Sequence, residues 1–300
     1  MFKKVCIIGC GLIGSSLARA IKKNNLSDIV VSSNRSDFVN KKVIELKIVD
    51  DSNSDTKKIA EGSDLIVIAT PLSSYKDVIL KVKDSLSKGT ILTDVGSVKE
   101  SIISLVEKYI PEDVSWIPSH PIAGTEESGP EAGFSELFKN RWCILTPSQK
   151  AKGKEINLLK NFWEKIGSKV DIMDAKKHDH ILSITSHIPH LIAYNIVSTS
   201  LNIQDEKKSE IIKYSASGLR DFTRIAASNP IMWRDIFIQN KKNISVMVNK
   251  FIKNLEELKK AIENEDKKKL EQIFSKTKKI RKDIVKAGQD VDKPNFGRKQ

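Results

Sequence analysis

The residues that carry most information about chemistry form a glycine-rich turn near the N-terminus of this 300-residue chain. The segment 9–14 reads G-C-G-L-I-G, a G-x-G-x-x-G pattern that follows a β-branched run and precedes a helical run. Only glycine permits the tight turn, the close approach of backbone to a pyrophosphate and the close packing of helix on strand. The pattern predicts a dinucleotide site, against the alternative of a glycine turn without a ligand. The predicted contact residues are Gly9, Gly11, Leu12, Ile13 and Gly14.

The end of the second β-branched run bears on which dinucleotide binds. An NAD site usually has an acid about twenty residues after the last glycine, where it accepts hydrogen bonds from the ribose. Here the run ends in Asn34 and Arg35, so no carboxylate at that position repels a 2′-phosphate, and a guanidinium is available to bind one. The sequence favours NADP over NAD, or acceptance of both. The alternative is that Arg35 stacks on adenine.

Two further loops follow predicted strands, and ligands of open parallel sheets bind at the carboxyl ends of the strands. We expect Thr70 and Pro71 in the first of these loops to contact the cofactor. In the second loop, the hydroxyl of Ser97 and the ammonium of Lys99 are expected to face the nicotinamide end and the substrate. The alternative role for Ser97 is that of a helix N-cap.

All five histidines fall between residues 120 and 190. A zinc site is disfavoured because no cysteine or carboxylate at a recognised spacing completes the ligand set. His120 differs from the other histidines because it lies in a segment, 118–126, that is rich in turn formers and is expected to be a loop stiffened by prolines. A neutral imidazole there suits a general base that takes a proton from a hydroxyl as hydride leaves the same carbon. A packing histidine is the equal alternative. The five are His120, His178, His180, His187 and His190.

The elements that must position these residues differ between the two halves of the chain. Mostly apolar runs at 5–8, 29–31, 65–69 and 90–93 alternate with amphipathic stretches, which is typical of βαβ units and a parallel sheet. Runs at 142–145 and 169–173 are predicted as later strands around a helix at 154–166, with the sheet ending near residue 174. After residue 175 helical periodicity takes over, including 244–262 and 270–284.

The fold class predicted from this pattern is a Rossmann-type, doubly wound parallel α/β sheet followed by an all-α region. The predicted domains are 1–174, which binds the dinucleotide, and 175–300, which is helical. This division agrees with a prior of roughly 150 residues per domain.

Composition excludes some classes of protein and leaves others open. The 51 Lys+Arg and 38 Asp+Glu give a formal charge of +13, which fits a nucleic-acid surface, an anionic ligand or a lysine-rich surface. No stretch approaches the roughly eighteen apolar residues of a membrane span, so no membrane partner is expected. The three cysteines form neither an even disulfide set nor a CxxC pair, which favours a reducing compartment, the cytoplasm.

Together these motifs resemble the prephenate/arogenate (cyclohexadienyl) dehydrogenase family over nearly the whole chain. The blocks beginning at His120 and Asp221 are far more specific than the glycine motif. The matching segments are G-x-G-L-I-G-S at 9–15, D-x-x-S-x-K at 94–99, H-P-I-A-G-T-E-x-S-G at 120–129, S-H-x-P-H at 186–190, D-F-T-R-I-A at 221–226 and P-I-M-W-R-D at 230–235.

The resemblance implies an NAD(P)-dependent oxidoreductase of tyrosine biosynthesis. Such an enzyme oxidises the ring C4 hydroxyl of prephenate or arogenate while the C1 carboxylate leaves as CO2, giving 4-hydroxyphenylpyruvate or tyrosine. His120 matches the family's catalytic histidine, and Ser97 matches a serine near the ring hydroxyl and the nicotinamide. No metal is implied, because formation of an aromatic ring drives the decarboxylation.

The resemblance also implies a binding site for a small dicarboxylate and a homodimer formed through the helical half. Arg224 matches the arginine that binds a substrate carboxylate, and Asp179 and Asp221 are expected to hold basic side chains in place. Long amphipathic helices too apolar to be left exposed agree with a dimer. The remaining residues implied at the substrate pocket are Thr125, Glu126, His187 and His190.

Three other classes of protein fit part of the sequence. A β-hydroxyacid dehydrogenase has a similar build but needs a lysine in a G-x-x-G-x-G-x-x-x-K segment, which residues 150–200 lack. A nucleic-acid-binding protein could use the basic C-terminal helices and would bind with steep salt dependence. A cofactor-binding regulator would keep the glycine turn but would have no use for His120 and Arg224. We expect no nucleic-acid partner.

Overall fold

The computed structural model describes residues 1–125, 127–201 and 213–286 of the chain. It forms two compact units, Met1–Ile244 and Ser245–Gln300. All the residues discussed below as a candidate site belong to the first unit.

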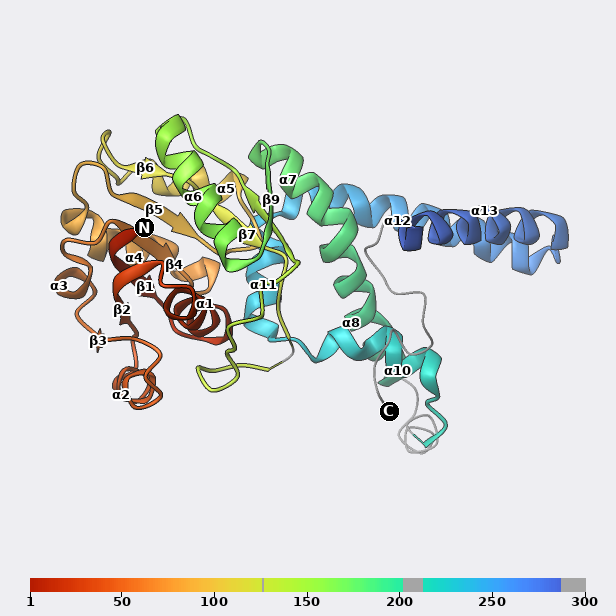
Figure 1. Cartoon of the computed structure of the whole chain (residues 1–300). Coiled ribbons are helices and arrows are strands. Elements are labelled where there is room, and N and C mark those ends of the chain that lie inside the picture. The colour runs from red at the N-terminus through yellow and green to blue at the C-terminus, as the bar shows by residue number, and fades with distance from the viewer. Residues whose placement is uncertain (126, 202–212, 287–300) are drawn as a thin grey trace. The chain divides into compact units, whose positions relative to one another are not determined.

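A six-stranded parallel sheet forms the centre of the first unit (Figure 1). Its strand order, β3-β2-β1-β4-β5-β6, is that of a Rossmann fold, as the sequence predicts. The four strands expected from apolar runs are all present. The short strand β3 was not expected, because its sequence, Asp-Ser-Asn, contains no apolar residue. The strands are β1 (Phe2–Ile8), β2 (Ser27–Ser33), β3 (Asp51–Asn53), β4 (Leu65–Ile68), β5 (Ile91–Asp94) and β6 (Ser115–Trp116).

Helices cover both faces of this sheet, which divides the apolar core in two. Successive side chains of a strand point to opposite faces, so Val5 and Ile7 of β1 enter one cluster with the helices α1 and α6, and Cys6 and Ile8 enter the other with α4 and α5. Burial on both faces explains why these strands read as continuous apolar runs. The helices are α1 (Leu12–Lys23), α2 (Asp37–Glu45), α3 (Thr56–Ala60), α4 (Tyr75–Val82), α5 (Glu100–Val106) and α6 (Gly153–Ile166).

A second sheet of three strands corrects two expectations. The runs near 142 and 169 do not extend the parallel sheet. They form β8 (Trp142–Leu145) and β9 (Lys169–Ile172), and β8 pairs with both β9 and β7 (Ser119–Pro121). The segment around His120, expected as a loop, is strand β7, antiparallel to β8. Pro118 lacks the N–H needed to continue the ladder beyond β6, so the chain leaves the first sheet there and begins the second.

After residue 174 the described chain is helical, as predicted from its periodicity. The two helices expected from periodicity, 244–262 and 270–284, lie within α12 and α13. None of the helices described is long and apolar enough to cross a membrane. The elements are α7 (Ala175–Leu182), a π-helical turn (Ser183–His187), α8 (Ile188–Leu201), α10 (Ser217–Thr223), a 3-10 turn (Arg224–Ala227), α11 (Pro230–Gln239), α12 (Lys241–Glu263) and α13 (Lys267–Lys286).

Candidate active site

The glycine turn between β1 and α1 has the geometry of a phosphate-binding loop. Gly9 has φ +98°, and a Cβ on Gly9 would lie 2.8 Å from the carbonyl oxygen of Ala69. A Cβ on Gly14 would lie 2.1 Å from the carbonyl oxygen of Gly9, so both positions exclude side chains. A Cβ on Gly11, by contrast, would meet nothing within 4 Å. Gly11 therefore leaves open space directly before the N-terminus of α1, where free N–H groups favour a pyrophosphate.

Asn34, directly after β2, is hydrogen-bonded to this loop. Its side chain is buried, its Oδ1 accepts a hydrogen bond from the backbone N–H of Cys10 at 2.6 Å, and its Nδ2 donates to Asn40 Oδ1 at 3.0 Å. A neutral amide thus occupies the place where an acid is usual. The neighbouring side chain, Arg35, is exposed at the same edge of the sheet.

The loop after β4 lies against the glycine turn. A Cβ on Gly9 would lie 2.8 Å from Cγ2 of Thr70, and Ser74 donates a hydrogen bond to Thr70 Oγ1 at 2.9 Å. Pro71 is exposed. From α11, the Asp235 carboxylate accepts a hydrogen bond from the backbone N–H of Ser73 at 3.1 Å, which ties the loop to the helical segment.

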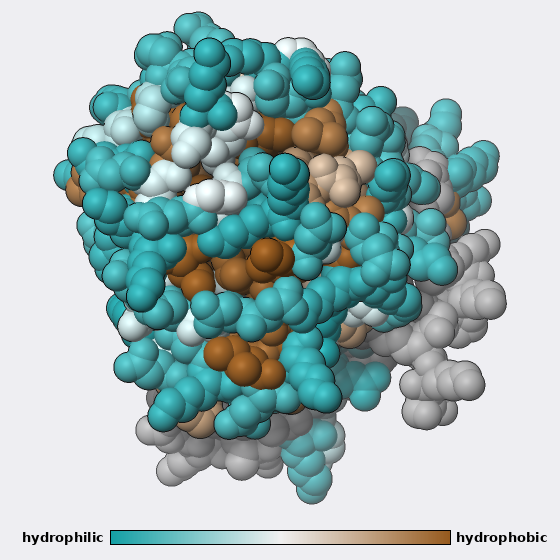
Figure 2. Space-filling model, turned by 60° about the vertical axis from the view of Figure 1, so that its left-hand side comes forward, coloured by the Kyte–Doolittle hydropathy of each residue, from teal (hydrophilic) through white to brown (hydrophobic). Residues whose placement is uncertain are grey.

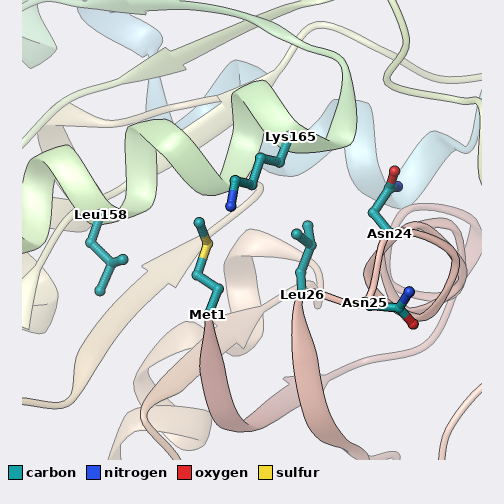
Figure 3. A pocket seen from close by; sticks show the side chains of 6 residues that line it. All are labelled: Met1, Asn24, Asn25, Leu26, Leu158 and Lys165. Carbon is teal, nitrogen blue, oxygen red and sulfur yellow. The ribbon is translucent and has the colours of Figure 1, made fainter.

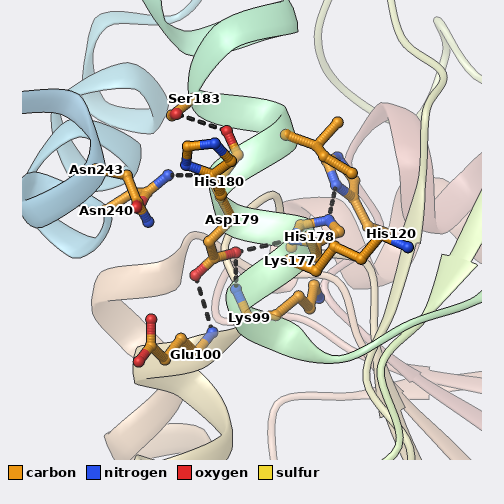
Figure 4. Close-up of polar contacts among 12 residues, drawn as sticks. Lys99, Glu100, His120, Lys177, His178, Asp179, His180, Ser183, Asn240 and Asn243 are labelled. Atoms are coloured by element: carbon orange, nitrogen blue, oxygen red, sulfur yellow. Dashed lines mark hydrogen bonds and ion pairs between the residues drawn. The ribbon is translucent and has the colours of Figure 1, made fainter. Parts of the chain in front are cut away.

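His120 is the first member of a buried chain of polar contacts (Figure 4). Its Nδ1 lies 2.8 Å from Nε2 of His178, and Nδ1 of His178 lies 2.8 Å from Oδ1 of Asp179. The two Asp179 oxygens also accept hydrogen bonds from the backbone N–H groups of Lys99 and Glu100, each at 2.9 Å. Asp179 therefore joins helix α7 both to the histidine pair and to the start of α5.

The surroundings of His120 keep its imidazole uncharged. Burial lowers the pKa of His120 well below its usual value, and the neighbouring His178, Lys99 and His187 lower it further. Burial also lowers the pKa of His178, against the opposing effect of Asp179. At neutral pH both rings are neutral, which is the state that a general base requires.

The sequence predicted that the Lys99 ammonium faces the nicotinamide end and the substrate. This prediction is wrong, because Lys99 is completely buried. Its Nζ donates to both carboxylate oxygens of Asp94, each at 2.7 Å, and to the carbonyl oxygen of Ser119 at 2.7 Å. Tyr75 adds a hydrogen bond to Asp94 at 2.8 Å. With its three donors satisfied, Lys99 supports the strand that carries His120.

Ser97 lies half-buried in the turn between β5 and α5. It is not the N-cap of α5, the alternative considered from sequence. That helix begins at Glu100, and the carboxylate of Asp179 satisfies its first N–H groups. The Ser97 hydroxyl is thus not required for capping.

The helical segment brings a second group of predicted residues together. His190 stacks on Trp233 with ring centroids 3.7 Å apart, and its pKa is lowered first by burial and also by the charge of Arg224. That effect places Arg224 close to His190. His187 is fully buried, accepts a hydrogen bond from Asn240 at 3.1 Å, and has a pKa lowered to about 4 by burial.

The remaining predicted residues are less closely gathered. Asp221 pairs with its neighbour Arg220 at 3.8 Å. Thr125 is exposed in the loop after β7 and accepts a hydrogen bond from the backbone N–H of Glu127 at 3.2 Å. Glu126 lies outside the described residues.

The sequence assigned no role to His178 or to the cysteines. A signal for His178 was present, because His178 and Asp179 follow each other at the start of a predicted helix, but nothing local shows that they face His120. Burial raises the pKa of Cys6 to about 12 and that of Cys10 to about 11, so both thiols stay protonated and unreactive.

A hollow at the opposite end of β1 and β2 has no comparable chemistry (Figure 3). Its lining contains one charged side chain, Lys165, and lies where the strands begin, away from the glycine turn. Ligands of this fold bind at the other edge. The lining residues are Met1, Asn24, Asn25, Leu26, Leu158 and Lys165.

A Rossmann sheet with an open glycine turn, together with a neutral histidine held in a buried polar chain, defines the class of a dinucleotide-dependent dehydrogenase. The chain belongs to the prephenate dehydrogenase family. Residues 17–172 match the model described as prephenate dehydrogenase, nucleotide-binding domain, and residues 174–276 match prephenate dehydrogenase, dimerization domain. The family and fold predicted from sequence are confirmed.

Characterised relatives cover nearly the whole chain. It is 37% identical to the cyclohexadienyl dehydrogenase of Zymomonas mobilis over 94% of this chain and 96% of the relative. It is 31% identical to the prephenate dehydrogenase of Bacillus subtilis over 92% of this chain and 75% of the relative. A crystal structure of prephenate dehydrogenase from Aquifex aeolicus with hydroxyphenyl propionate and NAD+ superposes with a TM-score of 0.89 at 31% identity, over 95% of this chain and 99% of that chain. The alternatives from other classes find no support in these matches.

Proposed function

We propose that this protein catalyses the NAD(P)-dependent oxidative decarboxylation of prephenate, of arogenate, or of both. The observation that carries the proposal is His120, a buried neutral imidazole next to the ligand edge of a dinucleotide-binding sheet. The relatives named above are a cyclohexadienyl and two prephenate dehydrogenases, which agrees with this chemistry.

In this reaction His120 takes the proton of the ring C4 hydroxyl as hydride leaves the same carbon. The nicotinamide cofactor supplies the hydride acceptor. The ketone that forms is conjugated to the carbon losing CO2, and formation of the aromatic ring supplies the driving force. The protein has mainly to orient the reacting groups and to balance anionic charge.

The substrate groups are assigned to residues of both halves of the chain. Ser97 is proposed to contact the ring hydroxyl, and Arg224, beside the His190–Trp233 stack, to bind a substrate carboxylate. We propose that residues 1–174 bind the cofactor and that 175–300 complete the substrate site and form a homodimer. Residues proposed to line or support the pocket are Thr125, Glu126, His187, His190 and Asp221.

The cofactor preference is proposed to lean toward NADP. Support comes from the end of β2, where Asn34 is neutral and engaged with the glycine turn, and where the Arg35 guanidinium is exposed. An exposed guanidinium can bind a 2′-phosphate through two parallel hydrogen bonds. The proposed cofactor contacts are Gly9, Gly11, Leu12, Ile13, Gly14, Asn34, Arg35, Thr70 and Pro71.

The experiment that tests the proposed function follows reduced-cofactor absorbance in four pairings: prephenate and arogenate, each with NAD and with NADP. We expect turnover in at least one pairing and a single hydroxyphenyl product with loss of CO2. Absence of turnover in all four would overturn the assignment.

Arg35→Ala tests the cofactor preference. Because it removes charge-assisted hydrogen bonds to a 2′-phosphate, we expect KM for NADP to rise about 10- to 100-fold while KM for NAD changes little. Steady-state kinetics with each cofactor measure both values, and Lys41→Ala, an exposed cation on α2, is the control. An equal change in KM for the two cofactors would show that Arg35 does not bind the 2′-phosphate and contacts a part that both cofactors share, for example the adenine.

A further inference from the structure

Two buried residues behind His120 have no part in the chemistry assigned so far. His178 is fully buried and Asp179 is 1% exposed. They come from helix α7, whereas His120 lies 58 residues earlier on β7. Figure 4 shows the three side chains in line, with Asp179 at one end and His120 at the other.

The hydrogen-bonding capacity of Asp179 determines where each proton in this line lies. An ionised carboxylate only accepts, so Nδ1 of His178, 2.8 Å from Oδ1, must carry the proton of that bond. In a neutral ring the other nitrogen is then an acceptor, so Nε2 of His178 accepts from Nδ1 of His120 across 2.8 Å. His120 consequently carries its proton on Nδ1 and has a free lone pair on Nε2.

We propose that His178 and Asp179 are positioning residues that hold His120 in the tautomer whose Nε2 accepts the substrate proton, and that stabilise its imidazolium once the proton has been transferred. This inference rests on the proposed function for the identity of the proton donor. The proton moves from the substrate hydroxyl to His120 Nε2, its bonding electrons form the ketone, and Asp179 keeps its charge throughout.

Of the charged groups around His120, Asp179 is the one that can stabilise the His120 imidazolium. The groups that face the ring are His178 and Asp179 from α7, His187 from the π-helical turn, and Lys99 and Asp94 from the end of β5 and the turn that follows. Lys99 and Asp94 are fully buried and neutralise each other at 2.7 Å. The two remaining histidines are neutral because burial lowers the pKa of each. Asp179 is therefore the carboxylate available to balance a charged His120.

Asp179→Asn is the sharpest variant, because it preserves shape but reverses the direction of the hydrogen bonds. Lys99 N–H donates to Oδ1 and Glu100 N–H to Oδ2, so the single amide oxygen keeps one of these bonds. With that oxygen in the place of Oδ2, it accepts from Glu100 N–H, and the amide N–H₂ takes the place of Oδ1 and faces His178. His178 Nδ1 must then accept, its Nε2 must donate, and His120 is left with a proton on Nε2. We expect kcat to fall about 10²- to 10⁴-fold, with KM and cofactor affinity within about threefold of the unmodified protein.

Nitrogen NMR of histidine-labelled, full-length protein provides a readout that needs no substrate. We expect His120 to be protonated on Nδ1 in the unmodified protein and on Nε2 in Asp179→Asn. The pH profile of kcat is the second readout: loss of the carboxylate lowers the pKa of the histidine pair, so the acidic limb shifts to lower pH while the plateau falls. If Asp179 only stabilised the fold, Asp179→Asn would change neither the protonated nitrogen of His120 nor the position of the acidic limb.

Two further variants complete the test. His178→Phe keeps an aromatic ring but breaks both hydrogen bonds, and it guards against a folding failure of Asp179→Asn. His180→Gln, an exposed histidine of the same helix, is the matched control and should retain full kcat. The inference is overturned if His120 carries its proton on Nε2 in the unmodified protein, or if both buried variants keep kcat within about twofold. Absence of turnover in the unmodified protein overturns the proposed function instead, and the NMR result still decides the tautomer.

Discussion

At the scale of single residues, His120 is prepared for its proposed role by what surrounds it. An exposed histidine titrates near pH 6.5. Burial first, and then the neighbouring His178, Lys99 and His187, lower the pKa of His120 well below that value. The neutral form is therefore dominant at every pH above the lowered pKa. Stability that depends on this neutral ring is fully present above about pH 6.5, the pKa of the unfolded chain. It is lost as the pH falls from about 6.5 toward the lowered pKa, because the unfolded chain gains a proton first.

The corresponding prediction concerns pH and the base itself. In the free enzyme, kcat/KM should stay level from neutral pH down past 6.5 and decline only below it, since that is where His120 gains a proton. His120→Asn should lower kcat by about 10²- to 10⁴-fold, the usual contribution of a general base. A full pH profile of both proteins checks this; an acidic limb at or above pH 6.5, or nearly full kcat in the variant, would contradict the role.

At the scale of elements, the turn between β1 and α1 contains glycines with two different roles: some are required by the protein's own backbone, and one leaves space for a ligand. Gly9 and Gly14 are required by the protein's own backbone, which approaches each to within 2.8 and 2.1 Å of a Cβ position. At Gly11 a Cβ would meet nothing within 4 Å, and its backbone angle is ordinary. The absence of a side chain there serves a ligand, since a pyrophosphate must approach the backbone closely.

This distinction predicts the behaviour of Gly11→Ala. The free energy of unfolding should change by less than about 1 kcal/mol, since the added methyl group is not strained. The Kd for NAD(P) should rise at least about tenfold, because the methyl group occupies the space of the phosphates. Calorimetric titration and urea unfolding measure the two quantities. Gly218→Ala, in α10, is the control and should leave Kd unchanged; an unchanged Kd in Gly11→Ala would remove the pyrophosphate from this turn.

A second feature at the scale of elements is the buried Lys99–Asp94 ion pair, which joins the end of β5, the start of α5 and strand β7. Breaking a buried ion pair by removing one partner leaves an uncompensated charge and costs about 3–5 kcal/mol. We therefore expect Lys99→Met to lower the free energy of unfolding by that amount in urea. Lys160→Met, which removes a surface pair with Glu164, should cost less than about 0.5 kcal/mol. Similar losses in the two variants would show that burial of Lys99 does not matter.

At the scale of the whole molecule, the helices of the second unit leave several large apolar side chains exposed, a feature that can mark an interaction surface. Segment 174–276 matches a model described as a dimerization domain. Large apolar side chains of α12 and α13 that are at least 47% exposed are Val246, Ile252, Leu255, Ile262, Phe274, Ile280 and Ile284.

We accordingly expect the protein to sediment as a homodimer at micromolar concentration. Phe274→Glu, which places a charge on the exposed apolar face of α13, should shift the equilibrium to monomer. Phe38→Glu changes a more exposed phenylalanine, 73% accessible against 55% for Phe274, in the first unit and should leave the dimer intact. Sedimentation equilibrium distinguishes the two. If Phe38→Glu also dissociates the dimer, or Phe274→Glu does not, the interface lies elsewhere.

The net charge of +13 also belongs to this scale. Polar and charged side chains cover most of the face shown in Figure 2, with apolar patches among them. The excess of positive charge comes from 51 Lys and Arg residues against 38 Asp and Glu residues. A dicarboxylate and a cofactor with several phosphates are sufficient anionic partners for it, because a net positive field steers anions toward the protein.

The sequence by itself determined what depends on local pattern. The glycine turn, the buried strands β1, β2, β4 and β5, and the helical second half follow from backbone geometry and from the two periodicities of strand and helix, which neighbouring residues set. Strand β3 was missed because none of its three residues is apolar, although its backbone pairs with that of β2. The location of His120 on a strand of a second sheet depends on pairing with β8, more than twenty residues away.

Only the tertiary structure decided which side chains meet. The burial of Lys99 against Asp94 and the line from His120 through His178 to Asp179 depend on packing between segments separated by up to 80 residues. Side-chain types show that an ammonium or an imidazole is present, but its charge and proton position depend on burial and on the partner across the contact. The sequence thus identified the histidine, and the fold determined which of its two nitrogens is free to accept a proton.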